Sequence, residues 1–82
     1  MIKSKLINHS FNLILVQGLD KIEIIHYSDI LYLKSYGNYT EFFLEDRTVL
    51  SCKNIGVYEK KLTTSFFRIH RSYIVNLEKI KY

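Results

Sequence analysis

Short apolar runs recur along this chain between clusters of turn residues, a pattern that is typical of β-strands. Five short runs rich in β-branched and aromatic residues are separated by turn residues, and the predicted strands are 13–17, 22–27, 30–35, 39–45 and 48–51. Since each strand follows the previous one after a short turn, we expect an antiparallel meander.

The connection at 36–38 has the chemistry of a hairpin turn. Gly37 and Asn38 both tolerate a left-handed backbone, and predicted strands lie on either side of them. Tyr36 and Tyr39 flank these two residues. We therefore expect all four residues at the tip of a β-hairpin.

One short helix is predicted after the fifth strand. Asn54 is a suitable N-cap, because its side chain can accept a hydrogen bond from an early backbone N–H. Ile55, Tyr58 and Leu62 follow on one helical face, and two lysines lie near the C-terminal end, where cations suit the helix dipole. Polar residues at 63–65 end the helix.

The next stretch, FFRIHRSYIVN at 66–76, places two cations and a histidine between two apolar blocks. Its alternation predicts two short strands with His70, Arg71 and Ser72 at a bend between them. We expect the flanking apolar residues to form a rigid frame for this bend, and they are Phe66, Phe67, Ile69, Tyr73, Ile74 and Val75. The elements together predict a mostly β fold, with short antiparallel strands in small packed sheets and one short helix.

The length and charge of the chain narrow the possible functions. With 82 residues there is room for one domain and one site. The net charge is +4, and residues 53–82 contribute +5 because they hold seven cations and two acids. A basic end of this kind suits a polyanion such as nucleic acid, but an ordinary solvated surface has the same signature.

Other classes of function lack the residues they need. The single Cys52 forms no internal disulfide, and His9, His26 and His70 lack zinc-ligand spacing with it, so we predict no metal and no other cofactor. Ser72 lies two residues from His70, which does not suit a nucleophile and its base, so we expect no enzyme. No run approaches the ~20 apolar residues of a membrane span, and a cytoplasmic protein is expected.

The residues of the bend have both a functional and a structural interpretation. The planar fork of Arg71 matches the O6 and N7 acceptors of guanine and also pairs with phosphate. Ser72 suits a phosphate oxygen. His70 either makes a contact of this kind or hydrogen-bonds to the backbone and holds the turn.

The residues that flank the bend also have structural interpretations. Arg68 either contacts a ligand or pairs with Glu45 or Glu78 across the sheet. Asn76 is expected to bond to backbone at the strand end, and Tyr73 and the phenylalanines are expected in the core, because aromatic residues at strand spacing usually bury area.

The motif FFRIHRSYIVNLEKI, after the helix NIGVYEKKL and the hairpin YLKSYGNYTEFFL, closely resembles the LytTR DNA-binding domain of bacterial response regulators. The resemblance covers residues 13–82, so residues 1–12 are interpreted as a lead-in or linker. It implies a mostly β fold that binds direct-repeat promoter sites, with loops that enter successive major grooves of double-stranded DNA. In full-length relatives an upstream receiver domain of a two-component system is implied.

By this resemblance, two loops read DNA, namely Ser35, Tyr36, Gly37, Asn38 and Tyr39 in the first and His70, Arg71 and Ser72 in the second. Asn38 would pair with adenine, unless it serves only the turn, and Arg71 would pair with guanine. The implied phosphate contacts are Lys34, Lys53 and Arg68.

The chain departs from the family pattern at its C-terminal end. Family members usually continue past the position of Ile80 with a closing strand pair and a further basic loop, so we expect the C-terminal strands to be missing here. An open edge strand would remain, and such an edge invites pairing with another chain. A homodimer through the C-terminal strand is therefore expected.

Sequence-specific binding of double-stranded DNA in transcription regulation, as the output module of a signalling system, is the leading hypothesis. The alternative is a small β module for protein interaction or self-association, without DNA affinity. RNA binding through Tyr32, Tyr36 and Tyr39 is a weaker third hypothesis.

Overall fold

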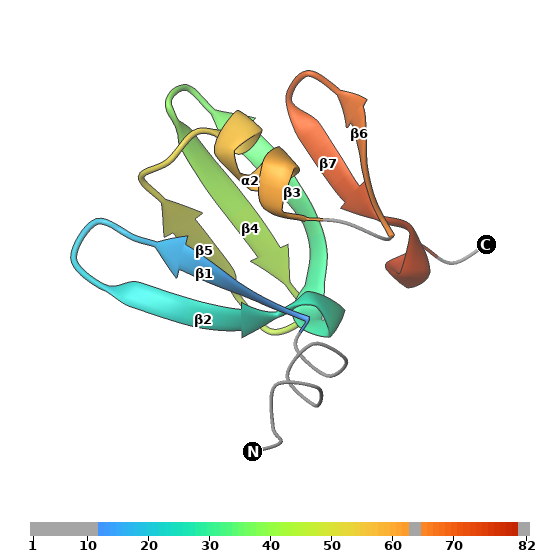
Figure 1. The fold of residues 1–82 in the computed structure, drawn as a ribbon, viewed down its shortest axis with the longest axis horizontal. Coiled ribbons are helices and arrows are strands. Elements are labelled where there is room, and N and C mark those ends of the chain that lie inside the picture. Colours follow the sequence, from blue (N-terminus) through green and yellow to red (C-terminus); the bar gives the residue numbers. More distant parts are fainter. Residues whose placement is uncertain (1–11, 63–64, 81–82) are drawn as a thin grey trace, which may run out of the picture.

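The structure, a computed structural model, describes residues 12–62 and 65–80. The strands are β1 (Leu13–Gln17), β2 (Ile22–His26), β3 (Ile30–Tyr36), β4 (Tyr39–Leu44), β5 (Thr48–Ser51), β6 (Phe66–His70) and β7 (Tyr73–Asn76) (Figure 1). The helical elements are the α-helix α2 (Ile55–Lys61) and two 3-10 turns, η1 (Tyr27–Asp29) and η2 (Leu77–Lys79). The predicted mostly β fold is confirmed.

None of the described helices is long and apolar enough to cross a membrane. Residues 1–11 of the expected lead-in lie outside the described residues.

The strands form two antiparallel sheets, not one meander. β1 pairs with β2, whereas the larger sheet has the order β5-β4-β3-β7-β6. The prediction that all five early strands pair in succession is wrong at β2, because η1 turns the chain before β3 begins. β7 lies between β3 and β6. The C-terminal strand is therefore not an open edge, and the exposed edge on this side of the sheet is β6.

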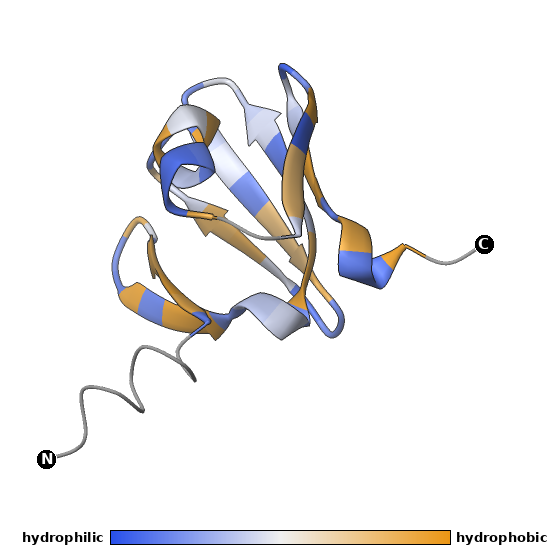
Figure 2. Cartoon of the chain, turned by 45° about the vertical axis from the view of Figure 1, so that its right-hand side comes forward, coloured by the Kyte–Doolittle hydropathy of each residue, from blue (hydrophilic) through white to orange (hydrophobic). Residues whose placement is uncertain are grey.

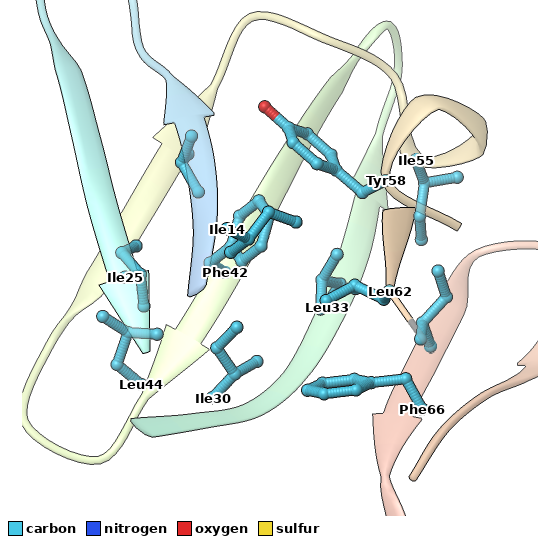
Figure 3. Packing of buried hydrophobic residues seen from close by; sticks show 12 residues of the cluster. Ile14, Ile25, Ile30, Leu33, Phe42, Leu44, Ile55, Tyr58, Leu62 and Phe66 are labelled. Atoms are coloured by element: carbon cyan, nitrogen blue, oxygen red, sulfur yellow. The ribbon is translucent and has the colours of Figure 1, made fainter. Parts of the chain in front are cut away.

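The core lies on the inner face of the five-stranded sheet, under the β1–β2 hairpin and α2 (Figure 3). Phe42 of β4 packs edge-to-face on Tyr58 of α2, with ring centroids 4.8 Å apart. The predicted core face of the helix is confirmed, since Ile55, Tyr58 and Leu62 are all buried. The other buried apolar residues are Ile14, Val16, Ile25, Ile30, Leu33, Leu44, Phe66 and Ile74.

The apolar frame expected around the bend is only partly buried. Phe66 and Ile74 lie in the core, but Phe67 is 50% exposed and Ile69 is 63% exposed. Phe67 pairs with Val75 on the outward side of the sheet, and an irregular register between Arg68 and His70 carries Ile69 outward as well. Figure 2 shows hydrophobic stretches along the strands, and hydrophilic residues at the tip of the β6–β7 hairpin.

Asn76, which is buried, ties the end of β7 to the start of β3. Its side-chain amide donates to the carbonyl of Ile30 at 2.9 Å. Its Oδ1 accepts from the hydroxyl of Ser65 at 2.6 Å and from the backbone N–H of Glu78 at 3.1 Å. The predicted backbone role of Asn76 is confirmed, and these bonds fix the β6–β7 hairpin against β3.

Candidate nucleic-acid interface

The β3–β4 hairpin ends in the two-residue turn Gly37–Asn38. Tyr36 pairs with Tyr39 as the last cross-strand pair. Gly37 has φ of 63°, a left-handed conformation that costs glycine nothing and strains residues with a Cβ. Asn38 is exposed, as are Tyr36 at 61% and Tyr39 at 40%. The predicted hairpin is confirmed, and its tip presents one amide and two phenol groups to solvent.

The β6–β7 hairpin ends in the turn Arg71–Ser72. The backbone N–H of Ser72 donates to Nδ1 of His70 at 3.0 Å, so this ring nitrogen acts as an acceptor. The interpretation of His70 as the residue that holds the turn is confirmed. Arg71 is exposed at the apex, and Ser72 is half-buried.

The two hairpin tips lie side by side at one end of the five-stranded sheet (Figure 1). β3 and β7 are neighbouring strands, with Lys34 paired to Tyr73. Beyond that pair, the backbone N–H of Ser35 donates to the carbonyl of Ser72 at 2.7 Å. This bond joins the base of one tip to the other, so the first and second predicted reading loops form a single surface.

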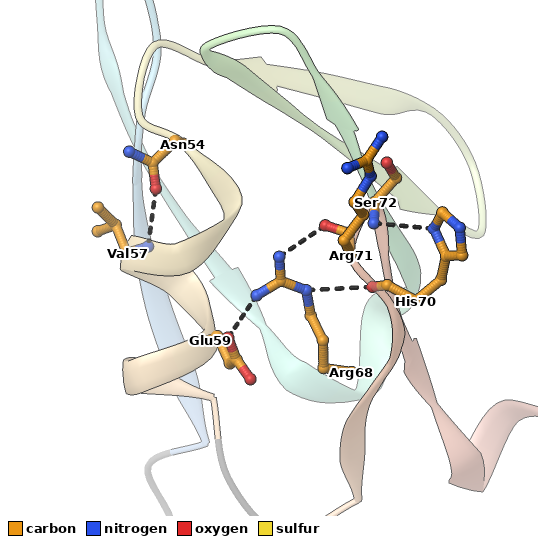
Figure 4. A network of polar contacts seen from close by, with 7 residues as sticks. All are labelled: Asn54, Val57, Glu59, Arg68, His70, Arg71 and Ser72. Atoms are coloured by element: carbon orange, nitrogen blue, oxygen red, sulfur yellow. Dashed lines mark hydrogen bonds and ion pairs between the residues drawn. The ribbon is translucent and has the colours of Figure 1, made fainter.

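Arg68 is bound beneath the second tip (Figure 4). Its guanidinium forms an ion pair with Glu59 of α2 and donates to the carbonyls of His70, at 3.1 Å, and Arg71, at 2.6 Å. The expected partners were wrong: Glu45 pairs with Lys79 instead, and for Glu78 the described residues show only its backbone N–H bonded to Asn76.

Glu59 is the one residue of this network that sequence reasoning missed. It lies nine positions before Arg68, and only the packing of α2 beside the β6–β7 hairpin brings the two side chains together. The helical pattern places Glu59 on the surface of the helix, next to buried Tyr58. The pattern does not identify Arg68 as its ion-pair partner, because that depends on the tertiary fold.

The predicted phosphate contacts Lys34 and Lys53 lie at the same end of the sheet. Lys34 stands between Glu41 of β4 and Tyr73 of β7 in the strand register. The exposed Lys53 is held through its backbone: its carbonyl accepts from the hydroxyl of buried Thr40 at 2.8 Å, and its N–H donates to Oγ of Ser51 at 3.1 Å.

The charges at this end differ in how far they are neutralised. Arg68 is paired with Glu59, whereas neither Arg71 nor Lys53 forms an ion pair within residues 12–62 and 65–80. In the same part of the chain, no cluster of His, Cys, Asp or Glu is arranged as a metal site. The end of the sheet is therefore a surface of hydrogen-bond donors, where Arg71, Lys53 and Lys34 form no ion pair within the described residues and are available to an anion.

Comparison with known proteins identifies a family and a similar solved structure. The family model described as LytTr DNA-binding domain matches residues 20–82. Among solved structures, the chain is similar to the LytTr DNA-binding domain of a Bacillus cereus protein described as a methyl-accepting/DNA response regulator, with 27% sequence identity and a TM-score of 0.72. That match covers 88% of this chain and 67% of the other chain. No curated protein matches. The family model spans most of the chain, and the chain therefore belongs to the LytTr DNA-binding domain family.

Proposed function

We propose that this chain binds double-stranded DNA in a sequence-dependent manner and serves as the output module of a transcription-regulating system. Membership of a DNA-binding family supports the general activity. The observation that carries the proposal is the bond from Ser35 to Ser72, which sets two donor-rich hairpin tips side by side at one end of the sheet. Loops on a rigid sheet present side chains to a ligand with little loss of conformational freedom.

Base reading is assigned to Arg71 and Asn38. The fork of Arg71 matches O6 and N7 of guanine, and the amide of Asn38 matches N6 and N7 of adenine. Both residues are exposed at turn apices, where the backbone does not shield them. Tyr36 and Tyr39 flank Asn38 and supply rings and hydroxyls to the walls of a groove.

Phosphate binding is assigned to the residues around the tips. Lys53 and Lys34 supply charge, and the hydroxyl of Ser72 supplies a donor. Arg68 has five N–H donors, of which three are used within the protein, so two remain for a phosphate oxygen. His70 keeps Nε2 for the same purpose, since its Nδ1 accepts from Ser72.

The spacing of the tips favours one groove over two. Successive major grooves on one face of DNA lie about 34 Å apart. Two turns joined by a hydrogen bond of 2.7 Å cannot span that distance. The major groove is about 12 Å wide, so both tips fit one groove and the phosphates beside it.

Direct repeats are then read by two copies of the chain, one at each repeat. We assign pairing between copies to the exposed edge of β6, because an unpaired edge offers backbone donors and acceptors to another strand. In a full-length relative, an upstream receiver domain sets when the copies meet. Residues 13–82 form the DNA-binding unit in this proposal.

A salt titration with fluorescently labelled duplex tests the proposal. Binding anisotropy is measured with a mixed-sequence duplex at two salt concentrations between 50 and 200 mM. We expect affinity to fall steeply with salt, because phosphate contacts release counterions. A chain that shows no binding at the lower concentration contradicts the proposal.

A second function, self-association without DNA affinity, is favoured by one observation. The outward face of the sheet carries a stacked aromatic pair, Tyr32 and Phe43, with ring centroids 4.4 Å apart. Phe67, 50% exposed, and Leu50, 37% exposed, lie on the same face. Apolar surface of this kind marks interaction sites. Sedimentation equilibrium of the DNA-free chain, run beside the salt titration, separates the two functions, since self-association alone gives a dimer that shows no salt-dependent DNA binding.

A further inference from the structure

Arg68 connects the β6–β7 tip to α2. Arg68 bridges Glu59 of the helix and the two carbonyls, of His70 and Arg71, that lead into the turn (Figure 4). Its side chain is 27% exposed. A planar fork with donors in fixed directions sets the orientation of both peptide units at once, which a point-charge ammonium does not do.

A second bond closes the same turn from the other side. The Ser72 N–H donates to Nδ1 of His70 at 3.0 Å, while the His70 carbonyl accepts from Nε of Arg68 at 3.1 Å. The turn carrying Arg71 is therefore held by side chains at both ends. All of these bonds are made within the chain, so they hold the tip without needing a ligand.

We infer that Glu59 and Arg68 are positioning residues for DNA recognition, forming a clamp in which α2 fixes the direction in which Arg71 points. This inference rests on the proposed function, because positioning matters only if Arg71 reads a base. The principal role of Arg68 is then to orient its own hairpin, and a phosphate contact through its two remaining N–H groups is secondary. Glu59 acts through Arg68 and touches no DNA.

The clamp and a simple phosphate contact predict opposite effects for one substitution. Glu59→Gln removes a negative charge close to the DNA-binding end. If Arg68 acts mainly on phosphate, this change strengthens binding to any duplex. If Glu59 orients Arg68, the same change loosens the tip and weakens binding to the preferred sequence.

The test uses the whole chain with Glu59→Gln, Arg68→Lys and, as a matched control on the exposed face of the same helix, Lys60→Gln. Two properties are measured: amide hydrogen exchange of Ser72 in the DNA-free protein, and anisotropy with a selected duplex and a mixed-sequence duplex. We expect both clamp variants to exchange Ser72 faster than wild type. Both should lose about two- to ten-fold affinity for the selected duplex, because mobile recognition side chains must be ordered on binding. Glu59→Gln, which touches no DNA in this account, should change little on the mixed duplex. The control changes neither the exchange nor the ratio of the two affinities.

Unchanged Ser72 exchange in both clamp variants overturns the inference, and so does tighter binding of Glu59→Gln to both duplexes. Glu59→Gln retains hydrogen-bonding capacity and the helix surface, so the test does not depend on Arg68→Lys folding normally. If wild type binds no duplex at all, the proposed function fails. The exchange rates then still decide whether Glu59 and Arg68 order the tip.

Discussion

The backbone N–H of Ser35 donates to the carbonyl of Ser72 across 2.7 Å, so that the two hairpin turns of the larger sheet are fixed beside one another. One turn carries Asn38 and the other carries Arg71, and both side chains are exposed. Because β3 and β7, one strand from each hairpin, also pair, neither tip can move far without breaking the sheet. The pair acts as one rigid surface.

Replacing Arg71 by alanine should reduce affinity for a preferred duplex by about 1–3 kcal/mol and relax base preference at one position. Arg71 sits at the turn apex and forms no ion pair among the described residues, so the loss reflects contact with DNA and not a lost internal bond. Anisotropy on selected and mixed duplexes measures the effect. Arg47→Ala is the control of equal charge, since Arg47 lies in the β4–β5 turn and pairs with Glu23. Equal losses on both duplexes would rule out base reading by Arg71.

Lys53 should behave differently from Arg71. As a phosphate contact, Lys53→Ala should weaken binding to all duplexes alike and lower the slope of log affinity against log salt by about 0.9. The reason is that one counterion fewer is released per complex. Affinities at several salt concentrations check this. An unchanged slope means that Lys53 does not contact phosphate.

Gly37→Ala should destabilise the fold by about 1–2 kcal/mol, because its φ of 63° strains a residue with a Cβ. Nothing lies within 4 Å of the position that a Cβ would take, so the cost comes from the backbone alone and not from a clash. Gly37→Asn tests this explanation, since asparagine tolerates the left-handed region. The Gly37→Asn protein should be destabilised much less than the Gly37→Ala protein. Urea unfolding compares the variants, and equal losses for both would point to a cause other than backbone strain.

Asn76→Leu should destabilise the fold more than a surface change. It leaves the Ile30 carbonyl without its side-chain donor and removes the acceptor of Ser65 and of the Glu78 N–H. A buried group left without a partner costs about 1–3 kcal/mol. Urea unfolding measures the loss, with Glu78→Gln, which keeps the backbone bond to Asn76, as the control. A variant as stable as the control contradicts the structural role of Asn76.

Local signals in the sequence predicted the parts of the fold that depend on neighbouring residues. The cap by Asn54, which accepts from the N–H of Val57 at 3.2 Å, and the turn at Gly37 are set within a few residues of chain. The separation of β2 from β3 was missed, because the pairing partner of β3 on that side, β7, lies some forty positions later. Strand alternation alone does not choose between such partners.

In the candidate site, too, the features set by neighbouring residues were predicted and those set by tertiary packing were not. The exposed apices at Asn38 and Arg71 follow from turn chemistry and were predicted. The partner of Arg68 was not, because Glu59 approaches it only through the packing of α2. The exposure of Phe67 was missed for a related reason: alternation tells which residues share a face, and the sheet order decides which face is covered.

Selection from a random duplex library, performed with wild type, Arg71→Ala and Asn38→Ala, tests the central claim most directly. We predict that wild type enriches a short motif and that the two variants each relax one position of it. The two relaxed positions should lie within about five base pairs of each other, half of one DNA turn, because the two tips share a groove. No enriched motif, or two affected positions a full turn apart, would contradict the account.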